Sequence, residues 1–339
     1  MIRRFASLGG TLLAVALVAA PAAAGTLDTV RERGRLVCGV NTGLLGFAAA
    51  GDDGKWSGFD VDFCRAVAAA IFDDADKVDY VPLSAGDRFA ALTDGKIDLL
   101  SRNSTWTMGR EAGLGITFVG VTYYDGQGFM VPRATGVFSS LELSGSKVCV
   151  QSGTTTEANL ADYFTANNMP YEVVVTASPE ESITAYKDGR CNVLTSDMSQ
   201  LYAERLRLDD TDEHVVLPDA ISKEPLGPAV RSDDPQWVLL NKWVLFALLN
   251  AEELGVASDT IEAALGSAKP EVRRLVGLDG DYGTQLGLTN DWVVRIVGAI
   301  GNYGETYERN LGVDSPLGIP RGMNQLWNRG GIQYAPPIR

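Results

Sequence analysis

The chain has 339 residues, a length that corresponds to roughly two domains of about 150 residues each. Its hydrophobic content of 45% is ordinary for a globular protein, and the sequence has neither a low-complexity tract nor a heptad repeat. A formal net charge of −14 at pH 7 argues against a basic surface for nucleic acid or anionic lipid, so we interpret the acidity as a contribution to solubility.

Residues 1–24 differ from the rest of the chain. Arg3 and Arg4 precede an apolar run from Leu8 to Ala20, and three alanines follow Pro21. This order of charged, apolar and small residues is typical of a secretory signal peptide, and the run is too short to span a membrane. We expect cleavage after Ala24 and export of the mature chain. Because the residue directly after the cleavage point is Gly25 and the first cysteine is Cys38, we expect no lipid anchor.

Strand and helix patterns alternate in the next part of the chain. Short apolar runs predict strands at 36–40, 80–83 and 97–100, and helical spacing predicts helices at 60–72 and 88–93. Such alternation indicates a parallel sheet with right-handed crossovers. Ligands bind these sheets at the carboxyl ends of the strands, where a loop after residue 40 and a Ser/Thr-rich turn at 101–105 lie.

The same pattern restarts after a predicted crossing strand at 128–131 and forms a second α/β unit. The predicted strands cover residues 147–150, 172–175 and 192–194, and the predicted helices cover residues 158–167, 179–186 and 198–207. Thr154 and Glu157 have the spacing of a capping box at the start of the first of these helices. From Asp234 onward the pattern is helical, with predicted helices at 237–253, 263–275 and 291–307, followed by coil.

Four cysteines follow the predicted signal peptide, and in an exported protein they suggest two disulfide bonds with three possible pairings. Cys38 and Cys64 lie in a strand and the helix after it, whereas Cys149 and Cys191 lie in two later strand-like runs. We predict the bonds Cys38–Cys64 and Cys149–Cys191, which need no link between domains. The spacing matches no zinc pattern, and the single histidine, His214, is remote in sequence, so we expect no metal site.

The stretch Ile97–Arg110 combines a buried strand, a polar turn and a helix start. Thr107 is suited to be the N-cap residue, which places Arg110 in the first helical turn. A guanidinium is poorly matched to the positive end of a helix dipole, and a bound carboxylate between Arg110 and the helix amides would remove that conflict. The alternative is a surface arginine paired with Glu111 or another acid.

Four segments resemble, in order, the periplasmic amino-acid-binding proteins of bacterial ABC transporters. They are Gly58–Val67, Ile97–Arg110, Val150–Glu157 and Ser196-Asp197. The similarity runs from about Leu36 to Ser232. The segment 222–228 and the closing residues 330–339 resemble the general L-amino-acid-binding branch of solute-binding protein family 3.

The resemblance implies an α/β, two-lobed periplasmic binding protein fold of type II. Each lobe would be a mainly parallel sheet flanked by helices, and a two-strand hinge would join the lobes. We expect the first lobe to comprise 25–126 and 223–339, with the C-terminal helical extension packed back on it, and the second lobe to comprise 127–222.

A zwitterionic ligand must have both of its charges met inside the site, because it loses water at both ends. The resemblance assigns the ligand carboxylate to Arg110 and Thr105, with helix amides at Thr154 and Thr155 from the other lobe. Asp197 would hold the ammonium with the backbone carbonyl near Asn103. The residues alone leave two alternatives open: Thr154 and Asp197 could each simply cap the helix that follows.

Side-chain selectivity rests on fewer signals. Arg88 aligns with an arginine that faces the distal carboxylate in relatives that bind acidic amino acids, although it could also lie outside the pocket. Many relatives place an aromatic lid where this chain has Leu44, and that departure favours a wide pocket of modest selectivity. Trp106 either lines the pocket or belongs to the core.

We therefore expect a periplasmic binding protein of a Gram-negative bacterium that delivers L-amino acids, including glutamate, glutamine and aspartate, to inner-membrane ABC permease subunits. We expect a monomer without cofactor, metal or nucleic acid, and no enzyme, because the only histidine lies in a loop-like segment and no phosphate loop is present. The enzymatic alternative is a periplasmic dehydratase of this fold that acts on cyclohexadienyl acids. A ligand-sensing module would need a transmembrane segment to carry its output.

Overall fold

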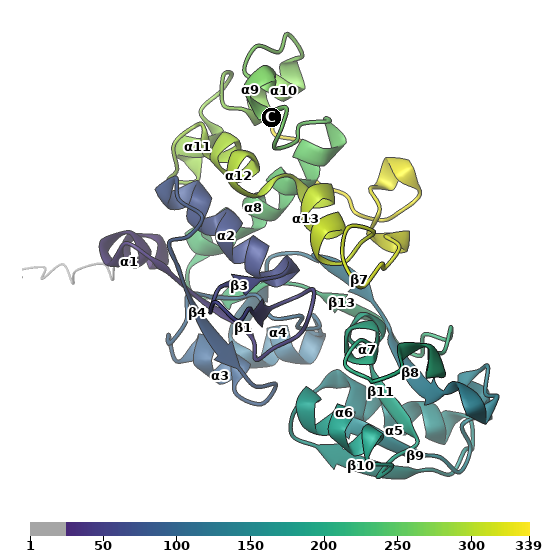
Figure 1. Ribbon diagram of the computed structural model, residues 1–339. Coiled ribbons are helices and arrows are strands. Elements are labelled where there is room, and N and C mark those ends of the chain that lie inside the picture. Colours follow the sequence, from purple (N-terminus) through teal and green to yellow (C-terminus); the bar gives the residue numbers. More distant parts are fainter. Residues whose placement is uncertain (1–24) are drawn as a thin grey trace, which may run out of the picture.

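The computed structural model describes residues 25–339, so the predicted signal peptide lies outside the described residues. Figure 1 shows two lobes of unequal size, each built on a five-stranded sheet and connected by two adjacent strands. We call the part built on the first sheet lobe 1 and the part built on the second sheet lobe 2. This architecture confirms the two-lobed α/β prediction.

The sheet of lobe 1 has the strand order β4-β1-β5-β14-β6. Its strands are β1 (Leu36–Asn41), β4 (Val78–Leu83), β5 (Leu99–Leu100), β6 (Ile116–Phe118) and β14 (Ala229–Arg231). Strand β1 runs parallel to β4 and β5, and β14 is antiparallel to β5 and β6. The helices of this part are α1 (Thr26–Arg33), α2 (Phe59–Phe72), α3 (Arg88–Thr93) and α4 (Met108–Leu114), and a short hairpin joins β2 (Ala49–Ala50) to β3 (Trp56–Ser57).

The sheet of lobe 2 has the strand order β10-β9-β11-β8-β12. Its strands are β8 (Gln127–Pro132), β9 (Lys147–Gln151), β10 (Glu172–Thr176), β11 (Val193–Asp197) and β12 (His214–Val216). Strands β9, β10 and β11 are parallel, whereas β8 is antiparallel to β11 and β12. The helices are α5 (Thr155–Ala166), α6 (Pro179–Lys187) and α7 (Met198–Arg205).

Two strands form the hinge between the lobes, β7 (Tyr123–Asp125) and β13 (Glu224–Leu226), and they pair antiparallel. The side chain of Asn324 lies on β7 as well: its Oδ1 accepts from the Tyr124 amide at 2.7 Å, and its Nδ2 donates to the Tyr124 carbonyl at 3.1 Å. The C-terminal segment therefore adds hydrogen bonds to a hinge strand that already pairs with β13.

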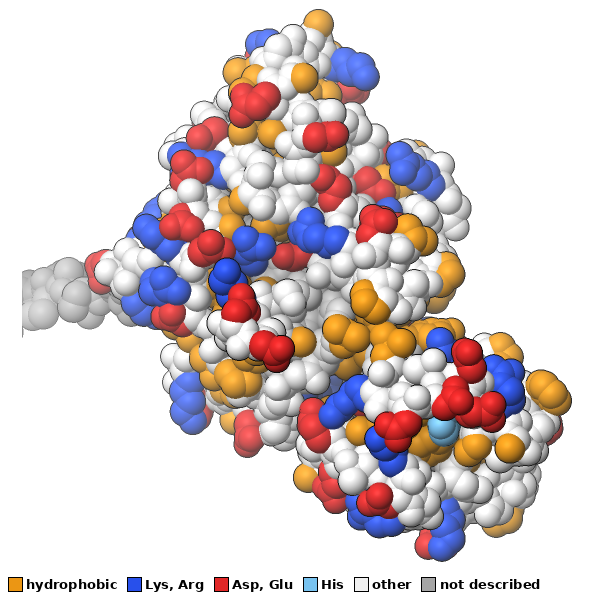
Figure 2. Space-filling view, in the orientation of Figure 1, with side chains coloured by type: hydrophobic (Ala, Val, Ile, Leu, Met, Phe, Trp, Pro, Cys, Tyr) orange, Lys and Arg blue, Asp and Glu red, His pale blue; other side chains and the backbone are white. Residues whose placement is uncertain are grey.

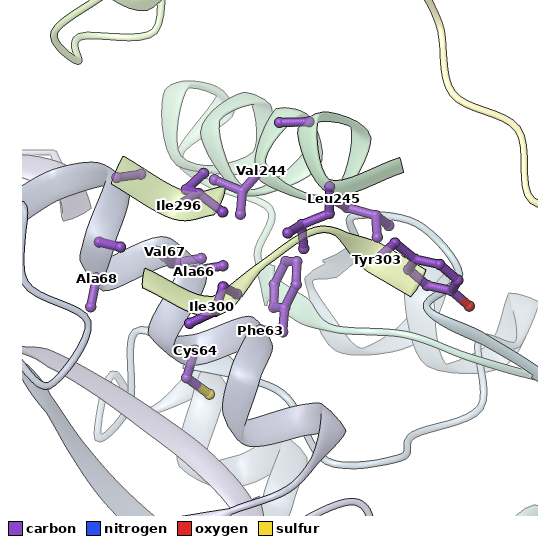
Figure 3. Packing of buried hydrophobic residues seen from close by; sticks show 14 of the residues in the cluster. Phe63, Cys64, Ala66, Val67, Ala68, Val244, Leu245, Ile296, Ile300 and Tyr303 are labelled. Atoms are coloured by element: carbon purple, nitrogen blue, oxygen red, sulfur yellow. The ribbon is translucent and has the colours of Figure 1, made fainter. Parts of the chain in front are cut away.

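Helices α8 (Pro235–Glu253), α9 (Ile261–Ala264), α10 (Pro270–Leu275), α11 (Tyr282–Gln285), α12 (Trp292–Ile300) and α13 (Tyr303–Asn310) follow the hinge. Figure 3 shows Ile296 and Ile300 of α12 packed among side chains of α2 and α8, including Val67 and Val244. This packing buries the apolar faces of three helices in one core with the lobe 1 sheet.

Two of the predicted C-terminal helices are wrong in extent. The stretch 263–275 contains α9 and α10 as separate short helices, with Pro270 at the start of the second. The stretch 291–307 is interrupted at Gly301, whose φ of 81° lies in the left-handed region, and Asn302 begins α13 with a capping box to Glu305. The apolar spacing continues across this break, which is why periodicity alone did not find it.

Both disulfide bonds join the cysteines that the sequence analysis paired. Cys38 of β1 bonds to Cys64 of α2, and Cys149 of β9 bonds to Cys191, which lies just before β11. All four side chains are buried, so each bond fixes a helix or loop to the sheet of its own lobe.

Over the face shown in Figure 2, acidic and basic side chains are interspersed, and hydrophobic side chains gather where lobe 1 meets lobe 2. Tyr202 and Leu206, on and just after α7, contribute to this junction by packing against the lobe 1 core. Within residues 25–339, no helix combines the length and the apolar character that crossing a membrane requires.

Candidate ligand-binding site

A narrow cavity with polar walls lies between the lobes at the carboxyl ends of the central strands. Lobe 1 contributes Arg88, Arg102, Asn103, Thr105 and Arg110. Lobe 2 contributes Gln151, Thr154, Thr155, Thr156, Ser196, Asp197 and Gln200. The cavity thus brings together seven of the eight ligand-binding residues that the sequence predicts, and the eighth, Leu44, lies elsewhere.

Arg110 is held at the start of α4 by two local hydrogen bonds. Its amide donates to the hydroxyl of the N-cap residue Thr107 at 3.2 Å, and its Nη1 donates to the carbonyl of Thr105 at 2.7 Å. Glu111 does not pair with Arg110; it accepts from Trp106 Nε1 at 2.7 Å instead. Burial lowers the pKa of Arg110, while the charges of Glu224 and Asp197 oppose that effect.

Arg88 is only 3% exposed and lines the cavity from the start of α3. Its Nη1 donates to the carbonyl of Ala85, whereas its Nε has no hydrogen-bond partner among the described residues. The ring of Phe89 lies 4.6 Å from the Arg88 guanidinium carbon and 5.1 Å from that of Arg110, so one aromatic ring contacts both cations.

A third guanidinium, that of Arg102, was not identified from the sequence. Its Nε donates to the carbonyl of Leu83 at 2.9 Å, and burial lowers its pKa to about 10, with the nearby Asp60 charge opposing the shift. Burial and the charges of Arg102 and Arg110 together lower the pKa of Arg88 well below its usual range. Because a guanidinium stays protonated in proteins, the three guanidiniums that line the cavity favour a bound anion.

Asp60, at the start of α2, shapes the turn that carries Asn103. Its carboxylate accepts from the Asn103 amide at 2.7 Å, and Asn103 adopts a φ of 28°, a conformation that L residues other than asparagine and aspartate rarely take. Asn41 Nδ2 also donates to Asn103 Oδ1 at 2.9 Å. Burial raises the pKa of Asp60 to about 7, against the hydrogen bond from Asn103 and the charge of Arg102.

Asp197 ends β11 and precedes α7, but its side chain does not cap that helix. Asp125 of the hinge performs this task, because its Oδ2 accepts from the Ser199 amide at 3.3 Å and from the Ser199 hydroxyl at 2.5 Å. The Asp197 carboxylate is therefore left to face the cavity. Burial, followed by the charges of Asp125 and Glu224, raises its pKa well above the usual range.

The predicted capping box at Thr154 is wrong. The Thr154 hydroxyl donates to the Gln151 carbonyl at 2.7 Å and does not cap α5, and the Glu157 carboxylate accepts from the Gly153 amide at 3.4 Å. The amides of the first turn of α5 are consequently not taken up by the Thr154 hydroxyl, and a helix start of this kind attracts a carboxylate.

Two aromatic or apolar candidates lie away from the cavity. Leu44 is 2% exposed and belongs to the lobe 1 core, where its backbone pairs with Ala48. Trp106 stacks on Phe118 with ring centroids 5.7 Å apart, so it packs against the lobe 1 core and is not part of the cavity lining. The described lining consists of polar and charged residues, which suits a charged ligand.

Two sheets, a two-strand hinge and a charged cavity between the lobes together define a two-lobed solute-binding protein. Residues 36–255 match the family described as "Bacterial extracellular solute-binding proteins, family 3", and the chain belongs to this family.

Individual relatives agree with this assignment. The general L-amino acid-binding periplasmic protein AapJ of Rhizobium johnstonii is 54% identical over 336 residues, which are 98% of each chain. The glutamate/glutamine/aspartate/asparagine-binding protein BztA of Rhodobacter capsulatus is 49% identical over 97% of this chain and 98% of its own. These relatives are transport binding proteins and not enzymes, so they do not favour the dehydratase alternative.

A solved structure is similar over nearly the whole chain. It is described as an ABC transporter periplasmic binding protein from Brucella ovis with glutathione bound. The two chains are 53% identical, with a TM-score of 0.92, and the match covers 93% of this chain and 100% of that one. The similarity includes the C-terminal helices that follow the family segment.

Proposed function

We propose that this chain is the periplasmic solute-binding component of an ABC transporter that binds L-amino acids, including glutamate, glutamine and aspartate, and delivers them to the permease in the inner membrane. The observation that carries the proposal is the charge pattern of the cavity. Three guanidiniums, those of Arg88, Arg102 and Arg110, and one open carboxylate, that of Asp197, line the same small space.

This pattern matches a zwitterion with an additional anionic group. Arg110 and the start of α5 suit an α-carboxylate, and Asp197 suits an α-ammonium. The α-carboxylate needs one guanidinium, so Arg88 and Arg102 remain for a second carboxylate of the ligand. We therefore expect acidic amino acids to bind more tightly than neutral ones of similar size.

Glutathione is a second candidate ligand, because the Brucella ovis relative contains it. It carries an amino-acid end with an ammonium and a carboxylate, as well as a further carboxylate at its glycine end. The same charges of the cavity that suit glutamate would suit the γ-glutamyl end of this peptide.

Isothermal titration calorimetry of the mature chain tests the proposal. We would titrate L-glutamate, L-glutamine, L-aspartate, L-alanine and glutathione, and we expect heat of binding for at least the first three. If none of these compounds binds or raises the melting temperature, the proposed function is wrong. Turnover of a prephenate-like substrate would instead favour the dehydratase.

Export and assembly need their own measurements. Cell fractionation with N-terminal sequencing should find a periplasmic chain that begins at Gly25, and analytical ultracentrifugation should find a monomer. Recovery of the chain in the cytoplasm with its first 24 residues intact would contradict the predicted signal peptide.

A further inference from the structure

Glu224 is a buried carboxylate on hinge strand β13, with 1% of its surface exposed. Its Oε2 accepts from the hydroxyl of Thr105 at 2.5 Å and from the hydroxyl of Thr155 at 2.8 Å. Its Oε1 accepts from Asn159 Nδ2 and from the Ser222 hydroxyl, each at 2.7 Å. Four side-chain donors from both lobes thus meet on one carboxylate.

These contacts determine what the two threonines can offer to the cavity. A threonine hydroxyl has one hydrogen and two lone pairs, and Glu224 Oε2 takes the hydrogen of both Thr105 and Thr155. The two hydroxyl oxygens lie 3.3 Å apart, and both residues line the cavity. Toward a ligand they can therefore present only lone pairs, as hydrogen-bond acceptors.

An acceptor pair at this place repels a carboxylate and attracts an ammonium. The family resemblance assigns Thr105 to the ligand carboxylate, and the contact with Glu224 argues against donation to that carboxylate by the Thr105 hydroxyl. Asp197 lines the same cavity, and Glu224 is close enough to influence its pKa. The negative charges of Asp197 and Glu224 thus act on the same part of the cavity.

We infer that Glu224 is a positioning residue that holds the hydroxyls of Thr105 and Thr155 as acceptors for the ligand ammonium. It acts through these two threonines, because they lie between its carboxylate and the cavity. Since Thr105 belongs to lobe 1 and Thr155 to lobe 2, the paired acceptors form only when the lobes meet. The inference rests on the proposed function, because it requires a ligand with an ammonium group.

Glu224→Gln is the first test, with L-glutamine as the calorimetric probe. A carboxamide has one acceptor oxygen and two N–H donors, so it cannot accept from all four donors, and the threonine hydrogens are released toward the cavity. We expect binding to weaken by about tenfold or more, as the loss of hydrogen bonds to a charged group implies. The matched control is Glu204→Gln, which changes another buried carboxylate that does not line the cavity, and we expect less than about a twofold effect there.

A double-mutant cycle separates positioning from a general structural role. We would measure Glu224→Gln in the wild type and in a Thr105→Val/Thr155→Val background. If Glu224 acts through the two hydroxyls, Glu224→Gln should change the affinity for L-glutamine little in the double-valine background. The effects on affinity are then strongly non-additive. Additive effects would overturn the inference. If Glu224→Gln does not fold, Glu224→Asp, which keeps the charge but shortens its reach, takes its place in the same cycle.

The wild type is measured first so that two failures can be told apart. If it binds none of L-glutamine, L-glutamate, L-aspartate and L-alanine, the proposed function fails and the inference falls with it. If it binds L-glutamine and the cycle is additive, only the role of Glu224 is overturned.

Discussion

Arg110 Nη1 donates to the carbonyl of Thr105, five residues earlier, at 2.7 Å. The bond ties the side chain at the start of α4 to the end of the polar turn that precedes it. One N–H of the guanidinium is used in this way, and the remaining N–H groups can bind a carboxylate as a fork. The contact with the Phe89 ring limits the side chain further, so little conformational freedom remains to be lost when a ligand binds.

Arg110→Ala should therefore weaken L-glutamate binding strongly. Removal of one partner of a buried charge pair costs about 3–5 kcal/mol, which is roughly a hundredfold to several thousandfold in affinity. Calorimetry measures the change, and Arg35→Ala, which removes a half-exposed arginine paired with Asp79, serves as the control. Equal affinity in the wild type and Arg110→Ala would show that the ligand carboxylate binds elsewhere.

The sequence identified residues of the site whose signal is local. Thr107 and Arg110 have a cap spacing, Asp197 ends a predicted strand, and the family resemblance adds Thr105 and Thr155. These signals hold because the carboxyl ends of parallel strands meet at one edge of a sheet. The strands could also be predicted, because buried strands appear in the sequence as short apolar runs.

The missed residues have contacts that are distant in sequence. Glu224 lies 119 residues from Thr105, and Asp60 lies 43 residues from Asn103. Neither carboxylate has a neighbour in sequence that indicates its partner. Arg102 stands in a turn where an arginine usually points to solvent, yet it is buried: its Nε donates to the carbonyl of Leu83, and the Asp60 charge lies nearby.

Arg88 should affect the preference for acidic over neutral amino acids more than the affinity for amino acids as a class. Arg88→Met keeps much of the side-chain volume and removes the charge, so binding of L-glutamate and L-aspartate should weaken by about tenfold or more while L-alanine changes little. Competition calorimetry with acidic and neutral amino acids gives the comparison. An equal loss for all ligands would make Arg88 a structural residue of the cavity wall.

Asp60 should make the fold less stable as the pH rises. Its pKa is about 7 in the folded chain and 3.8 ordinarily, so the folded state binds a proton more tightly than the unfolded state between these values. The stabilisation of the folded state by this proton is fully present below pH 3.8 and is lost as the pH rises through about 7. The expected loss over this whole range is about 4 kcal/mol, of which about 3 kcal/mol falls between pH 5 and pH 8.

Denaturant melts at pH 5 and pH 8 test this effect in the wild type, in Asp60→Asn and in Asp52→Asn, which changes an exposed carboxylate. An asparagine can still accept from the Asn103 amide, so the turn should persist in Asp60→Asn. We expect that variant to lose less stability between the two pH values than the other two chains. Parallel behaviour of all three would exclude Asp60 as the source of the dependence.

The two disulfide bonds should each stabilise the mature chain. They close loops with sequence separations of 26 and 42 residues, which the chain-entropy account values at about 3–4 kcal/mol each. Paired serine variants, Cys38→Ser/Cys64→Ser and Cys149→Ser/Cys191→Ser, should both melt several degrees lower than the wild type. Reduction with dithiothreitol should lower the melting temperature of the wild type. It should not change the melting temperature of a variant in which all four cysteines are replaced by serine.

Asp197 should make ligand binding depend on pH. Its pKa is well above the usual range in the ligand-free chain, because it is buried and faces the charges of Asp125 and Glu224, while Arg110 and Arg88 act in the opposite direction. A ligand ammonium favours the ionised carboxylate, so binding below that pKa must first release a proton. Affinity should therefore be constant at high pH and fall by about tenfold per pH unit below the ligand-free pKa.

L-Glutamine is the appropriate ligand for this measurement, since its side chain does not titrate between pH 4 and pH 8. Asp197→Asn should bind more weakly at high pH and lose most of the pH dependence, because its carboxamide has no proton to release. Asp125, whose pKa is raised to about 6, and Asp60, whose pKa is raised to about 7, both chiefly by burial, are other carboxylates able to produce such a profile. If Asp197→Asn keeps the wild-type pH dependence, the proton comes from another carboxylate such as Asp125 or Asp60, and the ammonium does not bind at Asp197.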